Sequence, residues 1–320
     1  MNIVWACLLL AGGLALLWKC AGLLVTGAVG LAKQLGVSPL IIGLTIVAMG
    51  TSAPEVAASI AAAVRGAGDV AIGNVYGSNI ANLALVGGVC ALIRPIRIQL
   101  RTLRREVPVM LLVALLLWPV LVDKDLLRPE GFVLLAIFAG LILLTIYVSR
   151  KQPAEQQSEA AAVKRDTKRS VLFVVIGLAG LALGADMVVR GAVFIGEQIG
   201  LSEAVIGLTI IAIGTSLPEL ATCVAAAVKG QHDISIGNLV GSNVFNTLLV
   251  VGTAGVIRPF EEIAPRLAAG IDYWIMIVVS VVFAFVAIIG RRIIGRAGGV
   301  VLLCGYVAYM VYVLGYTAGI

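Results

Sequence analysis

The feature that most constrains this chain is a succession of apolar stretches, each long enough to cross a lipid bilayer. Hydrophobic residues make up 61% of the 320 residues and charged residues 12%, whereas soluble proteins carry about 25% charged residues. A helix needs about 20 apolar residues to span the hydrocarbon core. Division at charge and turn clusters therefore predicts an all-α polytopic membrane protein with ten transmembrane helices. The predicted spans are 3–31, 39–64, 70–93, 107–122, 131–148, 171–195, 204–228, 234–257, 271–289 and 298–316.

The basic residues predict the orientation of these spans. Loops after odd-numbered spans hold 16 Lys and Arg residues and the remaining loops hold five, and cytoplasmic loops are the ones enriched in these residues. We therefore expect both termini outside, the polar linker 150–169 in the cytoplasm, and a prokaryotic plasma (inner) membrane as the location. Because the net charge of +6 lies in short loops between apolar spans, it indicates topology and no nucleic-acid partner.

Two segments of the chain are near copies of each other. Residues 36–96 align with 200–260 without a gap, with identity at 33 of 61 positions, including Glu55 and Glu219. The copies begin with the second and seventh predicted spans, and five crossings reverse the direction of a chain. They therefore form inverted repeats, an architecture of secondary transporters. The predicted halves are residues 1–149 and 170–320, each with five helices.

Each copy places a glutamate inside an apolar span. The first motif reads Gly-Thr-Ser-Ala-Pro-Glu and ends at Glu55, and the second reads Gly-Thr-Ser-Leu-Pro-Glu and ends at Glu219. An ionisable residue inside a membrane is costly and is usually functional. Proline cannot continue a helix but suits the start of a new one, so we expect two half-helices, capped by Ser52 or Thr51. The break is expected to free carbonyl oxygens near the glutamates, at Ala48, Thr51, Ala212 and Thr215.

A second duplicated motif carries amides and hydroxyls. Asn74, Ser78 and Asn82 share one helix face in the first copy, and the second copy repeats the pattern with Asn238, Ser242 and Asn246. With the glutamates they form an all-oxygen donor set, which suits hard cations such as Ca²⁺ or Na⁺ and not zinc or copper. Structural explanations stay open for single features, since proline kinks, glycine seams and interhelical hydrogen bonds are common in membrane helices.

Other polar residues are interpreted structurally. Asp69 and Asp233 stand at span junctions and are expected to cap helices or lie at interfaces, and Asp186 with Arg190 forms an ion pair. His232 is expected in a solvated loop. The five cysteines have no CxxC spacing and are expected to be small buried hydrophobic residues.

Taken together, these motifs resemble the sodium/calcium exchanger branch of the cation/Ca²⁺ antiporter superfamily, in a minimal prokaryotic form. The resemblance covers essentially the whole chain. It implies that Glu55 and Glu219 ligate Ca²⁺ and Na⁺ at the membrane centre. It further implies mainly backbone oxygens from Ala48, Thr51, Ala212 and Thr215, outer Na⁺ sites at Ser78 and Ser242, and Asn82 and Asn246 in the middle. Some relatives carry Asp where this chain has Asn246, which argues against the potassium-dependent subgroup.

We therefore predict an antiporter, not an enzyme, that exchanges Ca²⁺ for Na⁺ by alternating access. An H⁺/Ca²⁺ antiporter is an alternative, because both glutamates can bind protons. A Ca²⁺-permeable channel is an alternative from a different class, with the two acids as its selectivity filter. Paired acids also occur in proteases, but no substrate-recognition motif accompanies them. The expected partners are the transported ions and membrane lipid, with no cofactor and no obligate protein partner.

Overall fold

The computed structural model describes residues 2–150, 167–200, 206, 210 and 212–318, and nearly all of them are helical. The first half contains α1 (Ile3–Leu35), α2 (Pro39–Ile42), η1 (Gly43–Val47), α3 (Ala48–Thr51), α4 (Ala53–Val64), α5 (Gly68–Ile80), η2 (Ala81–Val86), α6 (Gly87–Ile93), β1 (Ile96–Arg97), α7 (Leu100–Arg104), α8 (Glu106–Leu121) and α9 (Arg128–Arg150). The second half contains α11 (Thr167–Gln198), α13 (Ala212–Thr215), α14 (Leu217–Val228), α15 (His232–Phe245), η5 (Asn246–Val250), α16 (Val251–Ile257), α17 (Ile271–Ile289), β2 (Ile293–Ile294) and α18 (Arg296–Ala318). The expectation of an all-helical membrane protein is confirmed, apart from the two-residue strands β1 and β2, which pair antiparallel.

Within the described residues, seven helices are long and apolar enough to cross a membrane, and the broken helix 39–64 makes up to eight. Of the other two predicted spans, the fourth corresponds to α8, which has only 16 residues. The seventh begins partly outside the described residues and continues as α13 and α14. Most of the predicted linker 150–169 also lies outside the described residues. The ten-span count therefore stays a prediction.

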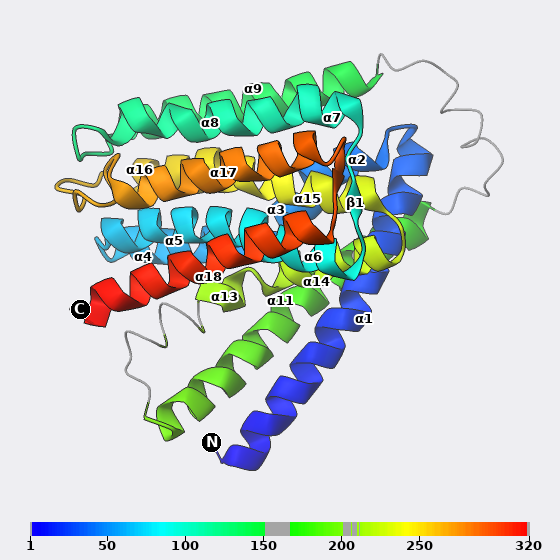
Figure 1. Ribbon diagram of the computed structural model, residues 1–320, viewed down its shortest axis with the longest axis horizontal. Helices are drawn as coiled ribbons and strands as arrows, with labels where there is room; N and C mark the ends of the chain where they lie inside the picture. The colour runs from blue at the N-terminus through cyan, green and yellow to red at the C-terminus, as the bar shows by residue number, and fades with distance from the viewer. Residues whose placement is uncertain (1, 151–166, 201–205, 207–209, 211, 319–320) are drawn as a thin grey trace.

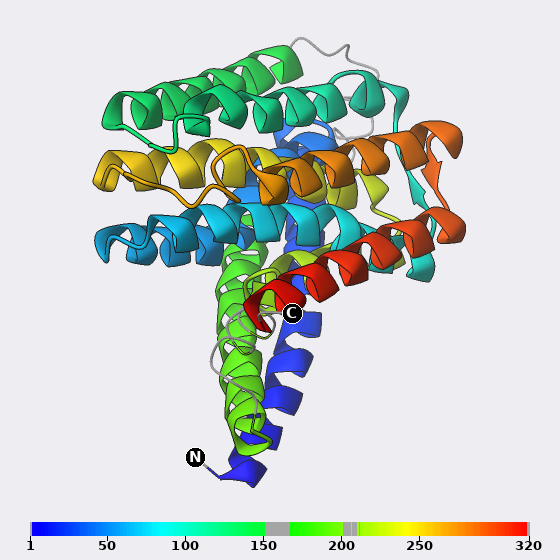
Figure 2. The same cartoon turned by 60° about the vertical axis from the view of Figure 1, so that its left-hand side comes forward.

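Helices α1 and α11 form a pair that leans away from the rest of the molecule, and both views show them side by side (Figures 1 and 2). They run antiparallel and approach closely, because a side-chain carbon at Gly13 would lie 2.8 Å from the Gly184 carbonyl oxygen. Small residues allow membrane helices this approach. The pair packs on η1, α3 and α14 and so flanks the helices that carry the duplicated motifs.

The loops gather at two opposite ends of the bundle, and each end joins the two halves. At one end, the Arg94 side chain donates to the Val228 carbonyl oxygen at 2.8 Å, at the C-terminus of α14. At the other end, Arg258 donates to the Val64 carbonyl oxygen of α4 at 3.4 Å. Arg94 and Arg258 occupy matching positions of the two copies. The contacts are therefore reciprocal between the halves.

Helices α5 and α15 form the interior of the bundle. The apolar windows of 68–93 and 232–257 are 72% buried, against 11% for α9, which leaves large side chains such as Leu143 exposed on the outside. Such an apolar exterior suits lipid. Both central helices widen into π-helical turns, and π-turns inside helices often mark functional sites. These turns begin at Ala81 and at Asn246.

Candidate functional site

Breaks in two helices carry the glutamates into the centre of the molecule. Helix α4 begins after Ser52, which has φ −82° and ψ 6°, and bends by 45° from the segment before it. Helix α14 begins after Ser216, with φ −88° and ψ 4°. The predicted break is thus present in both copies, although before the second one the structure describes only the short helix α13. Each break puts a glutamate in the first helical turn, where the helix dipole favours negative charge.

The two carboxyl groups lie close together and are shielded from solvent. Glu55 is 1% exposed and Glu219 is 0% exposed, and Glu219 Oε1 accepts a hydrogen bond at 2.8 Å from Ser52, three residues before Glu55. Two negative charges this close inside a protein are unfavourable unless cations or protons neutralise them. The pair is therefore suited to a cation or proton that both carboxyl groups share.

One glutamate is bonded to a serine from the opposite break. The Ser52 hydroxyl donates to Glu219 Oε1 at 2.8 Å, whereas the Ser216 hydroxyl, at the matching position, is buried without a hydrogen-bond partner. The expectation that Ser52 or Thr51 caps the new helix is wrong, because neither break has a side-chain cap. The Ser52 hydroxyl instead donates to a glutamate of the other half. Sequence reasoning missed Ser52 as a site residue, although both copies place a serine two residues before the proline.

Several of the predicted site residues carry buried polar atoms that have no hydrogen-bond partner. Both carboxyl oxygens of Glu55, Oε2 of Glu219, and the amide groups of Asn82 and Asn246 are in this state. A buried polar atom without a partner costs about 1–3 kcal/mol. Oxygen atoms left in this way are the ligands that Na⁺ and Ca²⁺ prefer. No cluster of three or more His, Cys, Asp or Glu side chains lies among the residues that the structure describes.

The remaining predicted site residues differ in their burial and contacts. Ser242 donates to Glu219 Oε1 at 3.4 Å, and Ser78 is buried on α5. Thr51 is buried at the end of α3, Thr215 is partly exposed at the end of α13, and Ala212 begins α13, its side chain outside the described residues.

The proline does not free the Ala48 carbonyl as expected. That oxygen still accepts from the Ser52 amide at 3.0 Å and from the Thr51 hydroxyl at 3.3 Å. The reason is geometric: the N–H that Pro54 lacks would point to Gly50, four residues earlier. In the second copy, the Ser216 amide donates to Ile213 at 3.1 Å instead.

Two asparagines hold the breaks in place from neighbouring helices. Asn238 accepts from the Thr51 hydroxyl at 3.0 Å and donates to Cys223 Sγ at 3.3 Å. Its counterpart Asn74 donates to the Glu55 carbonyl oxygen at 3.3 Å and to Ser59 Oγ at 3.0 Å. The two are covered unequally, because Asn238 is fully buried and Asn74 is only partly buried. The two matching positions are therefore packed differently.

The structure also tests the residues that were interpreted structurally. Arg190 and Asp186 form the predicted ion pair at 2.8 Å. Asp69 and Asp233 contact loops, as expected for interface residues: Asp69 accepts from the Ala264 amide and Asp233 from Gln99. His232 is the first residue of α15, so its placement in a loop is wrong.

The prediction for the cysteines is correct for three of the five. Cys20, Cys90 and Cys223 are buried, whereas Cys7 and Cys304 are exposed on apolar helix surfaces.

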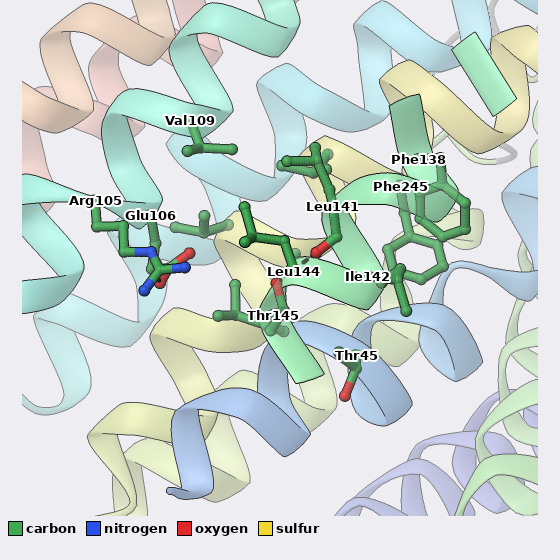
Figure 3. Close-up of a pocket in the computed structure, with 14 residues that line it drawn as sticks. Thr45, Arg105, Glu106, Val109, Phe138, Leu141, Ile142, Leu144, Thr145 and Phe245 are labelled. Carbon is green, nitrogen blue, oxygen red and sulfur yellow. Dashed lines mark hydrogen bonds and ion pairs between the residues drawn. The ribbon is translucent and has the colours of Figure 1, made fainter. Parts of the chain in front are cut away.

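A small cavity of about 70 Å³ lies elsewhere, between α8, α9, η1 and α15 (Figure 3). Figure 3 shows Phe138 beside Phe245, with Arg105 and Glu106 at the other end of the cavity. Neither Glu55 nor Glu219 lines it. This cavity is therefore separate from the carboxylate pair.

Comparison with known proteins gives consistent matches over nearly the whole chain. The family described as sodium/calcium exchanger protein matches residues 5–147 and 169–315. The inner membrane protein YrbG of Escherichia coli K12 is 40% identical over 311 residues, covering 94% of both chains. The sodium/calcium exchanger MaX1 of Methanosarcina acetivorans is 33% identical over 342 residues, covering 95% of this chain and 97% of that one. A solved structure of the sodium-calcium exchanger NCX_Mj, soaked with zero Na⁺ and Ca²⁺, has a TM-score of 0.83 at 28% identity. The match covers 96% of this chain and 98% of that chain.

Proposed function

Because the chain belongs to the sodium/calcium exchanger family, we propose that it exchanges Ca²⁺ for Na⁺ across a membrane by alternating access. As a member of this family, the chain is an integral membrane protein, and the family consists of cation/Ca²⁺ antiporters. The observation that carries the proposal is the shielded pair Glu55 and Glu219 among unpartnered oxygens. Two carboxylates balance one Ca²⁺ or two Na⁺, so either load neutralises the pair. An empty, charged pair is costly in a low-dielectric interior, which disfavours crossing without a load.

We assign the ligands by their place around this pair. Glu55 and Glu219 bind Ca²⁺ and Na⁺, and Asn82 and Asn246 complete the middle of the site. Ser52 joins them because its hydroxyl donates to Glu219, and Ser216 joins them as its counterpart with a buried, unpartnered hydroxyl. The other proposed ligands are the hydroxyls of Ser78 and Ser242 and the backbone oxygens of Thr51, Ala212 and Thr215. The Ala48 oxygen already accepts two hydrogen bonds, so it joins the ligands only if the Thr51 hydroxyl turns away from it.

The proposed architecture is two inverted five-helix halves, residues 1–149 and 170–320, with ten spans. Its support is the reciprocal contact of Arg94 and Arg258 with the opposite halves. The end near Arg94 carries most of the basic loops, so we place it in the cytoplasm and both termini outside. The partly buried Asn74 lies in the other half of the membrane.

A proton is the second candidate for the counter-ion. Glu55 and Glu219 repel each other in a shielded site, and one proton on either carboxyl group relieves that repulsion. The same residues would then exchange H⁺ for Ca²⁺. A channel would instead pass Ca²⁺ without any counter-ion gradient.

Uptake of ⁴⁵Ca²⁺ into proteoliposomes tests these functions. We expect a Na⁺ gradient to drive uptake. The uptake rate should fall about 100-fold in Glu55→Gln and in Glu219→Gln, because breaking a buried ionic arrangement costs about 3 kcal/mol or more. Asp186→Asn, which removes an exposed carboxylate, is the control and should keep full uptake. Uptake driven by a pH gradient alone would show proton exchange, and uptake with no gradient would show a channel. Full uptake by both Gln variants would refute the site.

A further inference from the structure

One buried hydrogen bond joins the two halves of the molecule close to the proposed ligands. Asn79 on α5 is 2% exposed, and Thr247 in η5 is 1% exposed. The Asn79 side-chain amide donates to the Thr247 hydroxyl oxygen at 3.0 Å, across 168 positions of the sequence. The same amide donates to the sulfur atom of Met276 on α17 at 3.4 Å. Asn79 therefore connects α5 with both η5 and α17.

This contact is next to two proposed ligands along the chain. Asn79 comes three positions before Asn82, and Thr247 directly follows Asn246. Asn82 and Asn246 are 0% exposed, and their side-chain amide groups have no hydrogen-bond partner among the residues that the structure describes. The positions of these two amide groups therefore depend on the backbone turns that carry them.

The turn that carries Asn246 is a π-helical turn, η5, and Thr247 lies within it. A π-turn has i→i+5 hydrogen bonds and so holds one residue more than an α-helical turn. In an α-helix one residue corresponds to a rotation of about 100°. A change of η5 into α-helix would therefore turn Asn246 relative to the rest of α15. The hydrogen bond from Asn79 to Thr247 ties this turn to the other half and holds it in place.

The other copy arranges the matching residues differently. Asn243 occupies the position of Asn79, but its amide donates to the Leu239 carbonyl oxygen of its own helix at 2.7 Å. Leu83 occupies the position of Thr247 and cannot form such a bond. The fold of the repeat therefore does not require this contact. The side-chain oxygen of Asn79 is also buried without a partner, which is costly, so packing alone does not account for an asparagine here.

We propose that Asn79 and Thr247 are positioning residues that fix the spacing of the Asn82 and Asn246 side chains and thereby make the ion site selective for cation size. Selectivity among hard cations depends on the size and the flexibility of the oxygen cage. A cage held at one spacing fits Ca²⁺ and disfavours Ba²⁺, which is larger and has the same charge. Without the hydrogen bond, η5 can move and the cage can widen. The inference rests on the proposed function, because it takes Asn82 and Asn246 as ligands.

Ion binding to the detergent-purified full chain tests the role of this hydrogen bond. Thr247→Val keeps the shape of the side chain and removes the hydroxyl, whereas Thr247→Ser keeps the hydroxyl. The rise of the unfolding temperature with ion concentration gives the dissociation constants for Ca²⁺ and Ba²⁺. We expect the ratio of the Ba²⁺ constant to the Ca²⁺ constant to fall about fivefold in Thr247→Val, because one hydrogen bond is lost. Thr247→Ser should restore the wild-type ratio.

Thr145→Val is the matched control, because the Thr145 hydroxyl donates to the Leu141 carbonyl oxygen of its own helix at 2.8 Å. This variant should keep the wild-type ratio. A Thr247→Val protein with a lower unfolding temperature but an unchanged ratio would show that the bond only stabilises the fold, which would overturn the proposal. If Thr247→Val does not fold, Thr247→Ala removes the same hydroxyl and takes its place in the test.

Competition during transport separates this inference from the proposed function. Ba²⁺ is added outside proteoliposomes during Na⁺-driven ⁴⁵Ca²⁺ uptake. We expect the Ba²⁺ concentration that halves uptake to be about fivefold lower in Thr247→Val than in the wild type, and an equal concentration would contradict the inference. Absence of uptake in the wild type would instead contradict the proposed function, and the ratio of the dissociation constants would still decide the role of Asn79 and Thr247.

Discussion

At the scale of single residues, the site depends on side chains that reach across from the opposite half. The Ser52 hydroxyl oxygen lies 2.8 Å from Glu219 Oε1, although the two residues are 167 positions apart in the sequence. The sequence predicted that both glutamates are functional and that Asn82 and Asn246 share their region. It did not predict the role of Ser52, because a serine before a helix usually caps that helix. Which acceptor such a hydroxyl finds depends on what packs against it.

Loss of the Ser52 hydroxyl should weaken ion binding. A hydrogen bond to a charged group contributes about 1.5–3 kcal/mol, so Ser52→Ala is expected to raise the Na⁺ concentration for half-maximal exchange by about tenfold or more. Ser280→Ala serves as the control, because Ser280 is also buried but donates only to the Met276 carbonyl oxygen of its own helix. The measurement is exchange against Na⁺ concentration. Equal values for the two variants would contradict the assignment.

At the scale of elements, the break in each span and the packing of the central helices shape the site. The prolines predicted the breaks correctly. The π-turns at η2 and η5 were not predicted, because local sequence gives little signal for a single widened turn. On the α15 side the helices are in close contact: a side-chain carbon at Gly241 would lie 2.8 Å from both Ala48 Cβ and the Leu44 carbonyl oxygen.

Filling this contact should destabilise the protein. Gly241→Ala introduces a methyl group against backbone and side-chain atoms, and overpacking of this kind costs about 1–3 kcal/mol. We expect a lower unfolding temperature, by several degrees, in thermal denaturation of the detergent-purified protein. Gly140→Ala on the exposed face of α9 is the control, since no atom of the described residues lies within 4 Å of its added carbon. A Gly241→Ala protein as stable as this control would show that the contact can relax.

At the scale of the whole molecule, Arg94 and Arg258 each join the two halves at one end of the bundle, by donating to a carbonyl oxygen of the other half. The loops after odd-numbered spans meet at one end: β1 pairs with β2, and Gln99 donates to Asp233. The loops after even-numbered spans meet at the other, where Leu126 pairs with Phe260. This separation agrees with the order of crossings expected from the loop charges.

Labelling of single cysteines tests the proposed orientation in intact cells. With the exposed Cys7 and Cys304 replaced by Ser, a membrane-impermeant maleimide should label Lys124→Cys in intact cells. It should label Gln231→Cys only after permeabilisation, because positive-inside loops face the cytoplasm. The reverse pattern would invert the topology, and labelling of both in intact cells would contradict the assignment of opposite sides.

The sequence by itself determined the apolar spans, the duplicated glutamates, the broken helices and the all-oxygen character of the donor set. These features follow from hydropathy, proline geometry and repeated residue types, which act over a few neighbouring residues. Only the tertiary structure decided that the Ser52 hydroxyl donates to Glu219 and that Asn238 is more deeply buried than Asn74. Ser52 and Glu219 are 167 positions apart, so these features depend on how separate helices pack together. The two copies are similar in sequence, yet packing gives each half different neighbours.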